Sequence, residues 1–125
     1  MKEHWKTEPD QHDYPAAHDY LTLITDDATA TRLVDELKQA ALTRRKAKDI
    51  LRASRLELLP ADNVHVAKDL DKVKTGKPLS PVLLVRGHTH PGLRTSDDLI
   101  IADGYHRVCA SHHLDENADI PCKLI

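Results

Sequence analysis

The stretch LIIADGYHRVCASHH, residues 99–113, decides the fold of this chain. Its first four residues are apolar, which is typical of a buried strand. Asp103 and Gly104 then give a turn, because glycine lets the backbone bend sharply. The residues from Tyr105 onward favour a helix. We therefore predict a strand over 99–104 that passes directly into a helix over 105–114.

Further apolar runs, turn signals and helical spacing lie on both sides of this stretch, within residues 55–125. We predict strands over 55–59, 81–87 and 120–125, a helix over 61–76 that ends at Gly76, and a hairpin loop over 88–98. The resulting order, β-α-β-β-α-β, predicts an α+β domain over 55–125: a small mixed sheet with packed helices.

An N-terminal region precedes this predicted domain. Residues 1–24 are acidic and polar and contain two prolines, so we predict a partly extended arm. Residues 25–54 show helical spacing of apolar residues, as one bent helix or two, with Thr25 as the N-cap. An acidic arm and a basic helix could pair within one chain or between two, so a homodimer is compatible with the sequence.

Composition limits the classes of protein to consider. The chain has 125 residues and a net charge of −2, which favours a single domain and argues against a dedicated non-specific DNA-binding protein. We find no apolar run of membrane-spanning length and no signal-peptide pattern at the start. Two cysteines are too few for a disulfide framework, so we expect a cytoplasmic protein with no membrane partner.

The junction at Gly104 has the chemistry of an anion site. A helix start leaves backbone N–H groups without partners and carries partial positive charge. Arg107 could contact phosphate oxygens, His106 could move a proton, and Asp103 could hold a magnesium ion or cap the helix. The alternative is a purely structural corner with Arg107 in solvent, because a single glycine turn is a weak signal.

The segments PVLLVRG, LIIADGYHRVCAS and IPCKLI together resemble the ParB/sulfiredoxin domain family, over roughly residues 55–125. The resemblance is carried by Pro81, Gly104, His106, Arg107 and Ala110. It implies a free-standing ParB/sulfiredoxin-like domain in which Gly104, Tyr105, His106 and Arg107 bind the phosphates of a nucleotide, ATP or CTP. If the protein is an enzyme, NTP hydrolysis or phosphoryl transfer is implied, with His106 or Asp103 in the proton or metal role and Mg²⁺, held by Asp103, as the cofactor.

Two departures from the family narrow this expectation. Sulfiredoxins have their reactive cysteine directly after the motif glycine, where this chain has Tyr105. A phenol cannot replace a thiolate, so we do not expect sulfinic acid repair, and we expect Cys109 to be a buried, unreactive side chain. ParB partition proteins continue into a DNA-binding domain. This chain ends at Ile125, after the last predicted strand, so we do not expect centromere binding.

A nucleic-acid function is the alternative. If residues 43–55 are helical, basic residues fall on or beside one face and could contact phosphates of nucleic acid, as in a ParB-like nuclease or regulator: Arg44, Arg45, Lys48, Arg52 and Arg55. A charged face is more often simply solvated, and the net charge does not favour a nucleic-acid partner. A non-catalytic interaction module is the third hypothesis.

Overall fold

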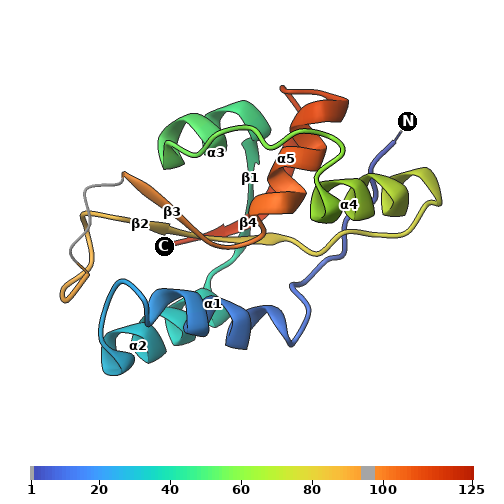
Figure 1. The fold of residues 1–125 in the computed structure, drawn as a ribbon. Coiled ribbons are helices and arrows are strands. Elements are labelled where there is room, and N and C mark those ends of the chain that lie inside the picture. Colours follow the sequence, from blue (N-terminus) through green and yellow to red (C-terminus); the bar gives the residue numbers. More distant parts are fainter. Residues whose placement is uncertain (1, 94–97) are drawn as a thin grey trace.

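The structure is a computed structural model that describes residues 2–93 and 98–125. Over these residues the chain forms five helices and four strands (Figure 1): α1 (Asp13–Leu21), α2 (Asp27–Gln39), β1 (Leu42–Lys46), α3 (Ala47–Ser54), α4 (Val64–Lys74), β2 (Val82–Arg86), β3 (Leu99–Asp103), α5 (Tyr105–Leu114) and β4 (Asp119–Leu124). Within the same residues, no helix combines the length and apolar character needed to cross a membrane.

The strands form one mixed sheet in the order β1-β4-β2-β3. β4 pairs antiparallel with β1 and parallel with β2, and β2 pairs antiparallel with β3. β3 is therefore an edge strand, and α5 begins at its C-terminal end. The predicted α+β class, with a small mixed sheet and packed helices, is confirmed.

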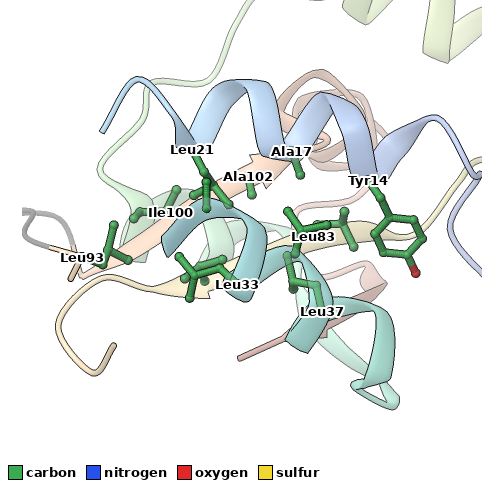
Figure 2. Close-up of a cluster of buried hydrophobic side chains, with 12 residues drawn as sticks. Tyr14, Ala17, Leu21, Leu33, Leu37, Leu83, Leu93, Ile100 and Ala102 are labelled. Atoms are coloured by element: carbon green, nitrogen blue, oxygen red, sulfur yellow. The ribbon is translucent and has the colours of Figure 1, made fainter. Parts of the chain in front are cut away.

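Helices cover both faces of the sheet (Figure 1). Because side chains alternate along a strand, neighbouring residues of β2 and β3 enter different cores. Leu83 and Ile100 pack with α1 and α2 in one core (Figure 2). Leu84 and Ile101 pack with α3, α4 and α5 in the other, together with Cys122 of β4. The sheet is thus the middle layer of three, and α5 belongs to the layer opposite α1 and α2.

The elements around the Gly104 junction agree with the sequence predictions. α5 spans the residues predicted for it, and β2, β3 and β4 lie within or one residue beyond the predicted strands. The predicted helix over 61–76 contains α4. Its N-cap is Asn63, whose side-chain oxygen accepts hydrogen bonds from the amides of His65 and Val66, and Gly76 follows its C-cap with a φ of 73°.

The predicted partly extended arm over 1–24 is wrong in its second half, where Asp13–Leu21 form α1. Tyr14, Ala17 and Leu21 lie along one side of this helix and are buried against the sheet (Figure 2). Pro15 is one reason for the wrong prediction, because proline usually indicates a segment that is not helical. Here it occupies the first turn, where a helix tolerates proline because the missing N–H would have no partner there.

The predicted helical region over 25–54 is interrupted by β1, so the helix considered for the basic residues over 43–55 is also wrong at its start. Thr43 pairs with Cys122 of β4, and α3 begins only at Ala47. Four of the five residues in β1 are exposed, so the strand shows no apolar alternation in the sequence. The N-cap of α2 is Asp26, whose carboxylate accepts from the Thr29 amide, and not Thr25.

The predicted strand over 55–59 is absent from the structure. Arg55 ends α3 in the left-handed conformation, with a φ of 58°. The chain then runs beside α5. There, two of its carbonyl groups contact α5 side chains instead of pairing with a neighbouring strand. The Tyr105 hydroxyl donates to the carbonyl of Glu57, and a ring nitrogen of His113 lies 2.6 Å from the carbonyl oxygen of Leu59.

Candidate functional site

Gly104 connects β3 to α5 with a φ of 110°. A Cβ atom at this position would lie 2.5 Å from Cγ1 of Val82 and 2.9 Å from Nη2 of Arg107. Both the backbone conformation and the packing therefore require glycine. No described side chain caps α5, so the amide groups of its first turn carry no side-chain partner.

A pocket of about 170 Å³ opens at this helix start. We call it the α5 pocket. Asp103, Gly104, His106 and Arg107 line it from the β3–α5 junction, and α4 supplies the rest: His65, Lys68 and Asp69. The α4 residues have i, i+3 and i+4 spacing, which places them on one helix face. These polar residues were not predicted as site residues, although their spacing is visible in the sequence, because only the apolar face of this helix indicated a structure.

His106 lies in the α5 pocket beside a second histidine. Its ring centroid is 4.7 Å from that of His65. Burial lowers the pKa of His106, and the neighbouring His65 and Arg107 lower it further, while Asp69 opposes them. Tyr105 does not line the pocket, because its hydroxyl donates to the Glu57 carbonyl at 2.6 Å. Tyr105 can therefore offer a ligand only its backbone amide.

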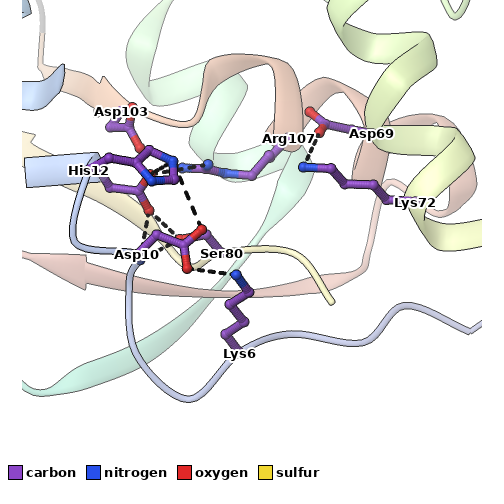
Figure 3. Close-up of polar contacts among 9 residues, drawn as sticks. Lys6, Asp10, His12, Asp69, Lys72, Ser80, Asp103 and Arg107 are labelled. Carbon is purple, nitrogen blue, oxygen red and sulfur yellow. Dashed lines mark hydrogen bonds and ion pairs between the residues drawn. The ribbon is translucent and has the colours of Figure 1, made fainter. Parts of the chain in front are cut away.

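Arg107 is largely occupied by contacts within the protein (Figure 3). Its Nη2 donates to Oδ2 of Asp103 at 2.6 Å, and its Nη1 lies 3.8 Å from Oδ1 of Asp13. Its side chain is 16% exposed. The Nε atom is buried and has no hydrogen-bond partner among the described residues. Arg107 is therefore not in solvent, where the structural alternative predicted it, and one of its donors is already bonded to Asp103, although the pocket leaves the helix start open.

The N-terminal segment holds Asp13 in place behind Arg107. Asp13 is 2% exposed, and its carboxylate accepts hydrogen bonds from the Ser80 hydroxyl and from the Asp10 amide. Asp10 in turn forms an ion pair of 2.7 Å with Lys6 (Figure 3). Residues that the sequence analysis assigned to an arm therefore anchor the predicted site.

Asp103, the predicted metal ligand and proton carrier, is bound by Arg107. Burial raises the pKa of Asp103, Asp13 raises it further, and Arg107 opposes both. Among the described residues, the metal-type ligand atoms that come together belong to Asp10, His12 and Asp13, within 4.8 Å of one another. Lys6 and Arg107 already balance those acids. Because Arg107 already binds Asp103, the donors around Asp103 do not fit a resident Mg²⁺ ion.

The basic residues predicted to share a helix face are divided between two elements. Arg44 and Arg45 belong to β1, whereas Lys48 and Arg52 belong to α3. Arg52 lies 3.4 Å from Asp49, and Arg55 lies 3.5 Å from Asp98. The single helix face on which the nucleic-acid alternative rested is therefore not present in the structure, and a nucleic-acid function stays a prediction.

Both cysteines are fully buried, as expected for Cys109. Burial raises the pKa of the Cys109 thiol and raises that of Cys122 to about 11. Neither sulfur is therefore poised as a thiolate.

No family model, curated protein or solved structure matches this chain. The resemblance to ParB/sulfiredoxin domains therefore remains a prediction from the residues around Gly104.

Proposed function

We propose that the α5 pocket binds a phosphate group, carried by a nucleotide or by another phosphorylated small molecule. One observation carries the proposal: the uncapped start of α5 opens onto a pocket that also contains Lys68 and two histidines. Unpartnered N–H groups, the positive end of the helix dipole and a mobile ammonium group all favour an anion at this point.

Different residues of the α5 pocket would supply different contacts to the anion. The amides of residues 105–107 would donate to phosphate oxygens, and Lys68, which is exposed, would close over the anion from α4. Arg107 would contribute a fixed positive charge in the wall, because Asp103 already takes its Nη2 donor. The carboxylates of Asp69 and Asp103 oppose an anion, so we expect affinity to depend strongly on pH.

An enzymatic form of this function is NTP hydrolysis or phosphoryl transfer. The pKa of His106 is lowered, which favours the neutral imidazole near pH 7. The ring could therefore accept a proton from an attacking water or hydroxyl group. Asp103 is better placed to position Arg107 than to carry a proton, because the two groups are 2.6 Å apart. ATP and CTP are the first ligands to test.

Calorimetric titration with ATP and with CTP, each with and without Mg²⁺, tests the proposal. Lys68→Ala should weaken binding about 10-fold to 100-fold, the worth of one charge-assisted contact. Lys74→Ala is the matched control, since Lys74 is exposed on α4 but does not line the pocket. Equal affinities of the two variants would refute binding at the α5 pocket, and no binding of ATP or CTP to the parent protein would refute a nucleotide as the ligand.

A further inference from the structure

A second pocket, of about 370 Å³, lies at the other end of β3 and shares no lining residue with the α5 pocket. We call it the α3 pocket. Leu84, Leu99 and Leu124 line it from the sheet, and Ile50 and Ala53 line it from α3. Its walls are therefore mainly aliphatic, and its volume lies within the range of about 300–1,000 Å³ that is usual for small-molecule sites.

Two arginines stand at this pocket on the same face of the sheet. Arg86 follows Leu84 by two residues in β2, so both are on the α3 side. Arg45 of β1 is paired with Ile120 of β4, which belongs to the core on that side. Both arginines are exposed, and among residues 2–93 and 98–125 neither forms an ion pair.

The acids at the α3 pocket do have partners. Asp49 lies 3.4 Å from Arg52, and Asp98 lies 3.5 Å from Arg55. Asp98 also lies 3.2 Å from a ring nitrogen of His88. Among residues 2–93 and 98–125, the arginines at this pocket that have no acidic partner are therefore Arg45 and Arg86, and they stand beside an aliphatic cavity.

We propose that the α3 pocket binds a small monocarboxylate with an apolar tail. The tail would lie against Leu84, Leu99 and Leu124, and the carboxylate would pair with Arg45 and Arg86, whose planar guanidinium groups match it. A single negative charge fits better than a dianion, because Asp49 and Asp98 line the same pocket and would repel added charge. This ligand site is separate from the proposed phosphate site.

Calorimetric titration with four probes tests the ligand chemistry. Octanoate should bind measurably, whereas acetate lacks the tail, 1-octanol lacks the charge, and octyl phosphate carries close to two charges. Each of these three should bind at least about ten-fold more weakly than octanoate. Failure of octanoate to bind, equal binding of 1-octanol, or tighter binding of octyl phosphate would each overturn the proposal.

Three variants locate the binding. Arg45→Gln/Arg86→Gln should weaken octanoate binding at least about ten-fold. Arg44→Gln/Lys46→Gln is the matched control, because it removes equal charge from β1 residues that do not line the pocket. Ala53→Leu should block octanoate by filling the cavity while leaving the charges in place. If octanoate affinity is the same in all three variants and in the parent, the ligand lies elsewhere and the proposal is wrong.

Discussion

At the scale of single residues, Arg107 contacts two acids of the protein that its motif does not predict. Its guanidinium lies between the carboxylates of Asp103 and Asp13, and both acids are largely buried. Removing one partner from such a group leaves charges that water cannot solvate, which is costly. Arg107 therefore serves the stability of the corner as well as the charge of the α5 pocket.

We expect Arg107→Ala to lower the free energy of unfolding by about 2–4 kcal/mol, because two acids lose their cation. Urea unfolding followed by the fluorescence of Trp5 measures this loss. Arg52→Ala is the control: its ion pair with Asp49 is exposed and should be worth less than about 1 kcal/mol. Equal stability of the two variants would show that Arg107 has no structural role.

The titrating groups of the α5 pocket predict its pH dependence. The pKa of His106 is lowered, so its ring gains a proton only below its ordinary value of 6.5. The pKa values of Asp69 and Asp103 are raised by burial, so these groups lose their charge at a higher pH than usual as acid is added. All three changes make the pocket more positive as the pH falls.

Sulfate affinity should therefore increase as the pH falls from 7.5 to 5. Sulfate is the suitable probe because it remains a dianion over this range, so any change belongs to the protein. Calorimetry at several pH values measures the trend, and His106→Gln should reduce it. An affinity that is constant, or that falls with acid, would contradict the assigned electrostatics.

At the scale of elements, α1 is a structural part of the fold. Its buried side chains cover one face of the sheet, and its first residue, Asp13, reaches Arg107. We expect Leu21→Ala to cost about 2–4 kcal/mol of stability, because the side chain is fully buried and leaves a cavity. Leu23→Ala, at an 81% exposed position just after α1, should cost less than about 0.5 kcal/mol. If urea unfolding finds the two equal, the N-terminal segment is only an arm.

The elements also show which helices and strands the local sequence can predict. β2, β3 and α5 were predictable because apolar runs and the Gly104 turn are local signals. β1 was not, because its basic, exposed residues favour a helix locally and only pairing with β4 makes them a strand. The buried apolar residues of α1 have helical spacing, but its proline is a local signal against a helix, so the helix was not predicted.

At the scale of the whole molecule, the α5 pocket combines residues that are distant in the sequence. The motif predicted the junction, with Gly104 and Arg107, but not the α4 wall with Lys68. It also could not predict Asp13, which is 94 positions before Arg107. Such contacts depend on tertiary packing, for which a single sequence gives no local signal. The fold class was therefore more predictable than the composition of the site.

The most direct test of phosphate binding at the α5 pocket is a titration of the ¹⁵N-labelled protein with ATP, followed by amide chemical shifts. The account predicts saturable shifts that are largest for residues 105–107 and for the α4 residues near Lys68. Lys68→Ala should need about 10-fold to 100-fold more ATP for the same shifts. Absence of shifts, or the largest shifts around Leu99 and Leu124 in the α3 pocket, would contradict it.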